Sequence, residues 1–306
     1  CVGGSFAGGN AYQVKGSLDA VGQTMPFFKE YPWIYGLLML VLTAIVIIGG
    51  IRRIASTADK IVPVMCSVYV LAGLLILLKN YSAVPGALSL ILTSAFSPEA
   101  YRGGFVGVLV WGFKRAAFSN EAGVGSAAIA HAAAKTEYPI REGIVALLEP
   151  FVDTIIVCTF TGLAIIVSGV WDSGQTGAVL SASAFEAAMP GIGKYLLAIS
   201  LAVFAFTTIL GWAFYSEKCW EFLFGTVTEK PFRLLWTLAV FPGAVLSLDF
   251  AWLVADTLNA LMAIPNLIAL LLLSPVIVTL TREYFARESA AAVARTGPAA
   301  VSASRN

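Results

Sequence analysis

A group of polar residues and glycines interrupts an apolar segment of this chain at residues 118–126, which read FSNEAGVGS. Ser119, Asn120 and Glu121 stand where the surrounding pattern predicts a helix that continues across a membrane. A helix opened inside hydrocarbon leaves backbone N–H and C=O groups unsatisfied, so a break is tolerated only where protein or a water-filled cavity surrounds it. Discontinuous helices of this kind form the binding sites of many secondary transporters, and the pattern therefore favours non-covalent binding of a small solute.

The two ends of the interrupted helix predict binding of opposite charges. The half that starts near Ser126 directs a partly positive N-terminus at the gap, which suits a carboxylate. The half that ends near Phe118 presents carbonyl oxygens, which suit a cation or an ammonium group. An amino acid carries both charges. Gly123 and Gly125 supply backbone freedom for the break, although they also fit a simple kink packed against a neighbouring helix.

Glu121 is a carboxylate inside an apolar segment, which is rare and usually functional. Its position allows it to hold a substrate amine, to bind a cation, or to pair with Lys114 or Arg115. His131, the one histidine in the sequence, lies in an alanine-rich helix. We expect this histidine to cap or pack rather than to relay protons.

Further polar residues have two interpretations each. Glu149 and Asp153 are four residues apart and share a helix face, which fits either a proton or cation site or two locally satisfied carboxylates. Thr207 and Thr208 stand in the middle of an apolar helix, where hydroxyls commonly bond back to the carbonyl four residues earlier. They also offer the oxygen atoms that a sodium ion needs. Trp212 fits closure over a small solute as well as ordinary packing.

The composition is that of a membrane protein. Hydrophobic residues make up 58% of the chain and charged residues 12%, and the mean hydropathy is +0.84, whereas a soluble domain is about a quarter charged. The net charge of +1, without a basic patch, argues against a nucleic-acid partner. The four cysteines form no CxxC pair and the sequence contains no HExxH or GxSxG motif, so we expect neither a metal centre nor an enzyme.

Apolar stretches of about 20 residues, the length that crosses a bilayer, recur along the chain. We expect seven spans and part of another at residues 1–22: 32–50, 61–78, 103–117 resuming as 127–134, 143–169, 192–216, 232–248 and 251–282. Residues 85–97 predict a short re-entrant or interfacial helix, and residues 184–190 another short helix. Pro265 predicts a bend in the last span, near Asp256 and Asn259, which we expect to pair locally.

Several of these segments resemble one family of transporters. The segments KRAAFSNEAGVGSAAIAHAAAKTEYPIREG, PFVDTIIVCTFTGLAIIVSG, FAFTTILGWAFYSEKCWEFLFG and ADTLNALMAIPNLIALLLLS are similar, in this order, to the alanine or glycine:cation symporter family. The resemblance extends from about Gly8 to Thr281. It implies sodium- or proton-coupled uptake of small amino acids across a plasma membrane, and a fold similar to the leucine transporter with two inverted five-helix repeats.

The resemblance also implies roles for particular residues. The interrupted helix matches the family's sixth core helix, so its residues would contact the substrate, and Trp212 would line the pocket. The segment GGNAYQVKG resembles a further family segment, although its Val14-Lys15 pair departs from the family pattern. Thr207 and Thr208, with the carbonyl of Phe204, match a sodium site. The substrate-binding residues implied in this way are Phe118, Ser119, Asn120, Gly123, Trp212, Gln13 and Asn10.

We therefore expect an all-α polytopic membrane protein with a partial leucine-transporter-like inverted-repeat fold. Residues 1–22 would end a first-repeat helix, 23–102 would hold two spans and the short helix, 103–286 the second repeat, and 287–306 a disordered tail. Because the chain starts with Cys1 and lacks a match to the first core helix, we expect an N-terminally truncated fragment that does not transport by itself.

The function expected from the sequence is sodium-driven import of a small neutral amino acid, alanine or glycine, through the plasma (inner) membrane. The expected partners are the bilayer, the amino acid and the co-transported sodium, with no other cofactor and no obligate protein partner. Proton coupling, another small solute and a non-transporting sensor remain alternatives. A channel is less favoured because no filter sequence repeats along the chain.

Overall fold

The computed structural model of the chain describes residues 1–97 and 105–296, and every regular element in these residues is helical. Four helical segments are long and apolar enough to cross a membrane: Ile51–Lys79, Pro139–Val167, Gly193–Phe224 and Leu248–Ala291. Pro32–Ile47 and Tyr81–Ala95 are shorter apolar helices. The prediction of an all-α polytopic membrane protein is confirmed, whereas the inverted repeats and the division at residues 22, 102 and 286 stay predictions.

Residues 1–97, the first described stretch, form a series of helices that follow one another closely along the chain. The chain begins with α1 (Val2–Gly4), the π-helical segment η1 (Ser5–Ala11) and α2 (Tyr12–Thr24), which follow one another without a break. Next come α3 (Pro26–Glu30), α4 (Pro32–Ile47), α5 (Ile51–Lys79), η2 (Tyr81–Ala83) and α6 (Val84–Ala95). Pro26 and Pro32 each stand at a helix start, where the missing N–H of proline leaves no bond unmade.

The helices of residues 105–296 carry the interrupted segment. They are α8 (Phe105–Ser119), α9 (Ala127–His131), α10 (Pro139–Ala146), α11 (Leu148–Pro150), the π-helical η3 (Phe151–Cys158), α12 (Thr159–Val167), α13 (Gly177–Ala188), α14 (Gly193–Phe224), η4 (Thr226–Thr228), α15 (Glu229–Gly243) and α16 (Leu248–Thr296). Elements α10 to α12 form one apolar segment. Residues 103–104 of the predicted third span lie outside the described residues.

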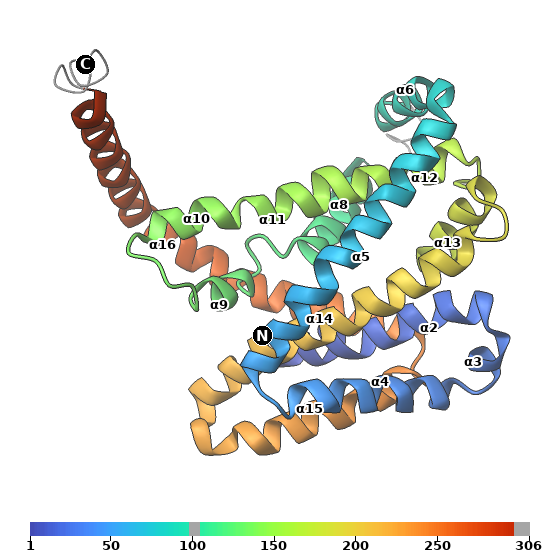
Figure 1. Ribbon diagram of the computed structural model, residues 1–306, viewed down its shortest axis with the longest axis horizontal. Coiled ribbons are helices and arrows are strands. Elements are labelled where there is room, and N and C mark those ends of the chain that lie inside the picture. Colours follow the sequence, from blue (N-terminus) through green and yellow to red (C-terminus); the bar gives the residue numbers. More distant parts are fainter. Residues whose placement is uncertain (98–104, 297–306) are drawn as a thin grey trace, which may run out of the picture.

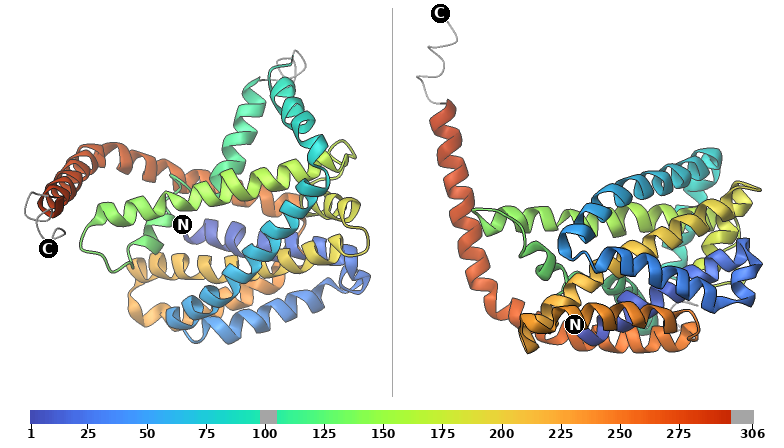
Figure 2. Two further views of the ribbon diagram at one scale, coloured as in Figure 1. Left: turned by 45° about the horizontal axis from the view of Figure 1, so that its top comes forward. Right: turned by 60° about the horizontal axis from the view of Figure 1, so that its bottom comes forward.

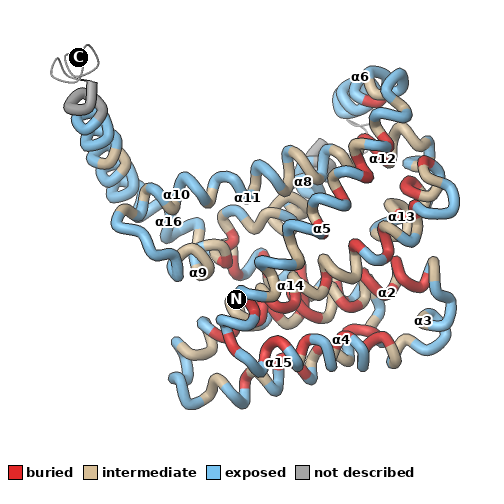
Figure 3. Tube along the Cα trace, in the orientation of Figure 1, coloured by how far each residue is buried: buried red, intermediate tan, exposed pale blue. Residues whose placement is uncertain are grey.

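Helix α14 forms the centre of the bundle and packs against α2, α4, α5, α13 and α15 (Figures 1 and 2). Its Ile209 and Leu210 are fully buried in one cluster with Val14 of α2 and Trp236 of α15. Buried positions concentrate on these helices, whereas α6, α10 and most of α16 are exposed (Figure 3). Exposed leucines on α16 fit contact with lipid, since the apolar stretch of this helix is only 6% buried.

The start of α5 and the end of α16 differ from the sequence prediction. Helix α5 begins at Ile51, ten residues before the predicted span, because the basic residues after Gly50 are good helix formers and continue the helix beyond its apolar part. Helix α16 continues to Thr296, so residues 287–296 are helical and the predicted disorder is wrong for them. Alanine, the strongest helix former, dominates that stretch. Residues 297–306 lie outside the described residues.

Helix α13 (Gly177–Ala188) starts earlier than the short helix predicted at 184–190. Helix α15 ends at Gly243, directly after Pro242, rather than at residue 248. In α16 both Pro265 and Pro275 stand inside the helix, and Figures 1 and 2 show this helix changing direction along its length. A proline inside a helix removes one backbone hydrogen bond and bends the axis, which fits the predicted bend.

Candidate functional site

Helix α8 ends at Ser119 and α9 begins only at Ala127, and the intervening backbone leaves the right-handed helical region. Gly123 has φ +78° and Gly125 φ +106°, values that an L-residue rarely adopts. Glu121 has φ +55° and is the one described non-glycine residue with positive φ. Non-glycine residues in this region are uncommon and cluster at functional sites. The polar sequence FSNEAGVGS therefore corresponds to an open stretch of chain between two helices.

Side chains from distant parts of the chain hold this stretch in place. Ser119 Oγ donates to Asp153 Oδ2 at 2.6 Å, and Asn120 Nδ2 donates to Thr154 Oγ1 at 2.8 Å. Thr154 Oγ1 in turn donates to Asp153 Oδ2 at 3.1 Å. Asn120 Oδ1 also accepts the N–H of Ala122 at 3.0 Å. Asp153 and Thr154 lie in the π-helical segment η3, a local irregularity that is frequent at functional sites.

Two further hydrogen bonds fix the glycine-rich end of the break. Asn266 Nδ2 of α16 donates to the carbonyl of Gly123 at 2.9 Å, and Ser126 Oγ donates to the Glu121 carboxylate. The break is thus fixed to η3 on one side and to α16 on the other. Ser119 and Asn120, two polar residues of the interrupted segment, therefore bond to protein groups that could not be predicted from the sequence.

A cavity of about 810 Å³ lies beside the break, within the usual range for small-molecule sites. Six of the predicted residues line it: Gln13, Phe118, Ser119, Phe204, Thr208 and Trp212. Glu121 and Thr154 line it as well. Asn10, Asn120, Gly123 and Thr207 are not among the lining residues. The sequence therefore names residues of one cavity together with residues that support its wall.

The residues predicted from GGNAYQVKG take different positions. Gln13 faces the cavity and donates from Nε2 to the carbonyl of Gly8 at 3.0 Å. Asn10 is fully buried and donates from Nδ2 to the carbonyl of Trp236 at 3.1 Å. A direct contact of Asn10 with a solute in this cavity is therefore not supported. Asn10 instead links η1 to α15.

The predicted sodium ligands lie on α14, and only some of them line the cavity. Thr208 and Phe204 line the cavity. Thr207 Oγ1 donates to the carbonyls of Val203 at 3.1 Å and of Phe204 at 3.0 Å, which is the back-bonding that the sequence offered as the alternative. Successive residues of a helix point about a third of a turn apart, so the two hydroxyls face different surroundings. Thr208 is the better placed of the two for an ion in the cavity.

The acidic residues beyond the break form a second polar group around His131. His131 Nδ1 lies 2.6 Å from Glu142 Oε1, and His131 Nε2 lies 3.7 Å from Glu149 Oε2. These contacts fit the packing role expected for this histidine. Glu149 and Asp153, four residues apart, have different neighbours: Glu149 lies beside His131, and Asp153 accepts hydrogen bonds from the hydroxyls of Ser119 and Thr154.

Arg115, considered above only as a partner for Glu121, forms another part of the cavity wall together with two aromatic residues that the sequence did not single out. Arg115, Tyr12 and Trp252 line the cavity. The Trp252 ring lies 4.1 Å from that of Tyr12 and 4.7 Å from that of Phe118. Asp256 Oδ2 lies 2.8 Å from Lys114 Nζ, so the expected local pairing of Asp256 with Asn259 is wrong. The four-residue spacing of Trp252 and Asp256 on one helix face is the signal that the sequence offered.

Comparison with known proteins shows which family the chain belongs to. The model of the sodium:alanine symporter family matches residues 1–296. The chain belongs to the sodium:alanine symporter family. The sodium/alanine symporter AgcS of Methanococcus maripaludis is 45% identical over 285 residues, which cover 92% of this chain and 62% of AgcS. The amino-acid carrier protein AlsT of Bacillus subtilis is 33% identical over 276 residues, which cover 89% of this chain and 57% of AlsT. The chain thus spans about three fifths of the length of these relatives.

Membership of the sodium:alanine symporter family confirms the resemblance read from the interrupted helix and its flanking segments. The family is one of multi-pass membrane transporters and not of enzymes. Roles of individual residues stay predictions. The role of Trp212 in the cavity wall can be tested by mutation, because η1 contacts α14 at this residue.

Replacing Gly9 with alanine is expected to disrupt the cavity wall. A Cβ at Gly9 would lie 2.2 Å from Cγ of Trp212, so the Trp212 ring, which is 6% exposed, would have to move. Overpacking of this kind costs about 1–3 kcal/mol. We expect a lower melting temperature in detergent and weaker alanine binding. Gly16→Ala in the following helix α2 is the control, because its Cβ would meet only Tyr12 Cζ, at 3.9 Å. Equal melting temperatures for the two variants would contradict the close contact.

Proposed function

We propose that the protein is a symporter that imports a small neutral amino acid, alanine or glycine, together with sodium through the plasma (inner) membrane. The observation that carries the proposal is the cavity beside the interrupted helix, in a chain that belongs to the sodium:alanine symporter family. An open stretch of backbone inside an apolar bundle is expected only where it faces a cavity or other protein. The family supplies the class of solute, and the cavity supplies a place for it.

The lining of the cavity supports a small zwitterionic solute. Glu121 and Ser119 offer acceptors to an ammonium group, and the rings of Phe118 and Trp212 offer apolar contact to a short side chain. Binding of the solute at the break would bias the equilibrium between outward-open and inward-open arrangements by its different affinity for the two. The identity of the amino acid depends on the shape of the occupied cavity.

A solute carboxylate needs a different binding group from the helix end that the sequence predicts. The helix after the break, α9, has only five residues. A single turn provides few aligned peptide dipoles, so α9 does not supply the positive helix end that the sequence argument assigned to Ser126. A solute carboxylate therefore requires a cationic side chain in the cavity wall.

The coupling ion is proposed to bind at Thr208 and at the carbonyl of Phe204, with Thr207 as a supporting residue. Hydroxyl and carbonyl oxygens are the hard ligands that such an ion prefers, and both Thr208 and Phe204 line the cavity. The hydroxyl of Thr207 bonds to the Phe204 carbonyl and so orients one of the proposed ligands.

Sodium dependence is expected to distinguish the two threonines. Thr208→Val removes a hydroxyl that lines the cavity, so we expect the sodium concentration for half-maximal uptake to rise at least tenfold. Thr207→Val removes a hydroxyl that bonds within its own helix, and we expect a rise of less than about threefold, or about 0.6 kcal/mol, the weak end of the range for one hydrogen bond. Alanine affinity at saturating sodium should change little in either variant. Equal loss of sodium and alanine affinity in Thr208→Val would contradict the assignment.

Uptake of radiolabelled alanine into proteoliposomes tests the proposed function, with the full-length protein under a sodium gradient and then under a proton gradient. Sodium-driven uptake would support the proposal. Uptake driven only by protons would replace the coupling ion. Alanine binding to folded protein without uptake under either gradient would identify a sensor, and would refute the proposal.

A further inference from the structure

Arg115 stands out among the residues of the cavity wall because it carries charge into a largely aromatic surface. Its guanidinium carbon lies 3.7 Å from the centre of the Trp252 ring and 4.8 Å from that of Trp111. Arg115 itself lines the cavity, as do Trp252 and Tyr12. Contact with two indole rings restricts the rotation of the guanidinium and holds its plane in one place.

The charges around Arg115 do not balance. Asp256 Oδ2 lies 2.8 Å from Lys114 Nζ and 3.6 Å from Arg115 Nη2, so one carboxylate faces two cations. In the part of the chain that the structure describes, neither cation has a second acidic partner within 4 Å. Lys114 lies closer to Asp256 and is not among the lining residues of the cavity. The surplus positive charge therefore belongs to Arg115, on the cavity side.

The hydrogen-bond donors of Arg115 point to the same conclusion. Its Nη1 is buried without a hydrogen-bond partner among the described residues, whereas the side chain as a whole is 35% exposed, so a solute would reach the guanidinium through its other N–H groups. A guanidinium whose one acidic neighbour lies closer to Lys114 favours a further acceptor, because donors of a charged group cost free energy when they are left unpaired. A guanidinium presents two parallel N–H groups that match the two oxygens of a carboxylate.

We propose that Arg115 binds the carboxylate group of the solute in this cavity. The inference rests on the proposed function and adds the residue that selects carboxylate-bearing solutes. Glu121 lines the same cavity with carboxyl oxygens that can accept from an ammonium group, so the wall offers complementary groups to both ends of an amino acid. A side chain of α8 would therefore bind the carboxylate in place of the start of α9, for which the sequence predicts this role. A chloride ion would satisfy the same donors, and the experiment has to separate the two anions.

The test compares Arg115→Gln with Lys114→Gln in the full-length protein. Each variant loses one positive charge next to Asp256. After Arg115→Gln, Lys114 and Asp256 remain as a neutral pair, so no uncompensated carboxylate is left behind. We expect Arg115→Gln to weaken binding of radiolabelled alanine about ten- to hundredfold, the effect of one charge-assisted hydrogen bond. Lys114→Gln should weaken it less than Arg115→Gln does, because the guanidinium remains in the cavity wall even where it becomes the sole cation beside Asp256, and Arg115→Lys should restore part of the affinity.

Alaninamide serves as the second ligand because it lacks the carboxylate. The wild type should prefer alanine to alaninamide at least tenfold, and Arg115→Gln should lose this preference. Measurements in chloride and in gluconate buffers decide between the anions: unchanged alanine affinity supports the solute carboxylate, and loss of affinity without chloride would overturn it. Retained preference for alanine in a monodisperse Arg115→Gln protein would also overturn the inference, while leaving the proposed function in place.

Propionate provides a measurement that does not depend on amino-acid transport. Its titration should change the tryptophan fluorescence of the wild type, because Trp111 and Trp252 flank the guanidinium, and should have no effect on Arg115→Gln. If the wild type bound propionate through Arg115 but no amino acid, the proposed function would fail and the carboxylate site would stand. If the wild type bound neither ligand, both would fail.

Discussion

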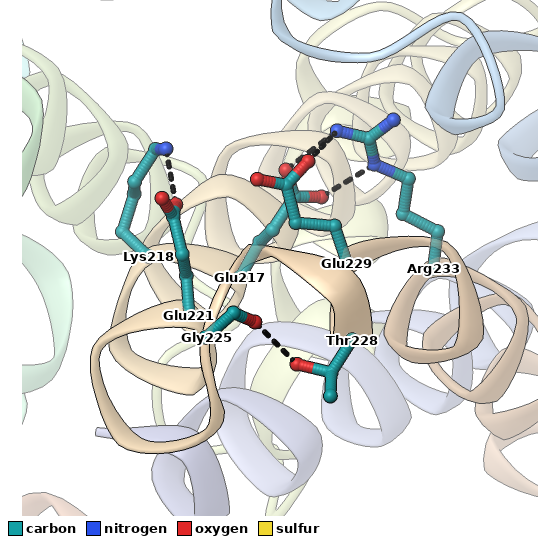
Figure 4. Close-up of polar contacts among 7 residues, drawn as sticks. All are labelled: Glu217, Lys218, Glu221, Gly225, Thr228, Glu229 and Arg233. Carbon is teal, nitrogen blue, oxygen red and sulfur yellow. Dashed lines mark hydrogen bonds and ion pairs between the residues drawn. The ribbon is translucent and has the colours of Figure 1, made fainter.

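Replacing Arg233 with alanine is expected to destabilise the bundle by about 3–5 kcal/mol, the usual cost of leaving a buried charge without its partner. Arg233 of α15 makes two parallel hydrogen bonds to Glu217 of α14, from Nε to Oε2 and from Nη2 to Oε1, each at 2.7 Å (Figure 4). The Glu217 side chain is only 8% exposed and that of Arg233 19%. Removal of the arginine would leave the Glu217 carboxylate buried and unpaired.

The position of this ion pair explains why the effect should extend beyond two side chains. Glu217 lies on the central helix α14, and Arg233 directly follows the first buried residue of α15, Phe232. A Cβ at Gly50, between α4 and α5, would lie 3.3 Å from Nη1 of Arg233. The guanidinium therefore lies between α14 and α15 and beside the connection from α4 to α5. Its loss should loosen the packing of α4, α14 and α15 together.

A thermal melt of the purified protein in detergent, followed by the fraction that stays monodisperse, measures the effect. Lys218→Ala is the matched control, because Lys218 pairs with Glu221 in the same region but is 43% exposed (Figure 4). Exposed pairs of this kind contribute less than about 1 kcal/mol. A melting temperature for Arg233→Ala equal to that of Lys218→Ala would contradict a structural role for the buried pair.

A double variant separates the cost of losing the ion pair from the cost of leaving the Glu217 carboxylate unpaired. Replacing a buried ion pair by apolar residues of similar volume is often close to neutral. Glu217→Met with Arg233→Met should therefore recover most of the melting temperature lost in Arg233→Ala. If the double variant melted as low as the single variant, the cost would lie in the hydrogen bonds themselves rather than in the unpaired carboxylate.

The sequence was sufficient for the class of protein and for its family, because both depend on local patterns. Apolar stretches identify helices that cross a membrane, and the segment FSNEAGVGS marks an interruption that needs special surroundings. The helix ends were harder to predict. Basic and alanine-rich stretches extend α5 and α16 beyond their apolar parts, since helix propensity does not depend on hydropathy.

The partners of the site residues could not be predicted, because they are far apart in the sequence. Ser119 bonds to Asp153 and Lys114 pairs with Asp256, contacts that depend on how α8 packs against η3 and α16. The rotation of a helix about its axis was equally hidden. Thr207 and Thr208 were equivalent in the sequence, yet only Thr208 lines the cavity. Asn10 was placed with the substrate, yet its amide bonds to α15.

Asn120 tests whether the shape of the break, rather than direct contact, controls binding. Asn120→Ala is expected to lower sodium-driven alanine uptake at least thirtyfold, because it removes both the hydrogen bond to Thr154 Oγ1 and the one from the N–H of Ala122. Two hydrogen bonds contribute about 2–3 kcal/mol. Asn120 does not line the cavity, so the loss would act through the position of Ser119 and Glu121 on either side of it.

Thr154 provides the matched control for this prediction. Thr154→Ser keeps the hydroxyl that accepts from Asn120 and donates to Asp153, so uptake should stay within about threefold of the wild type. Thr154→Val removes the hydroxyl and should reproduce part of the Asn120→Ala loss, with little further loss when the two are combined, as expected for residues that act through one bond. Additive losses would show that Asn120 and Thr154 act independently, and Asn120 would then be assigned to direct contact with the solute.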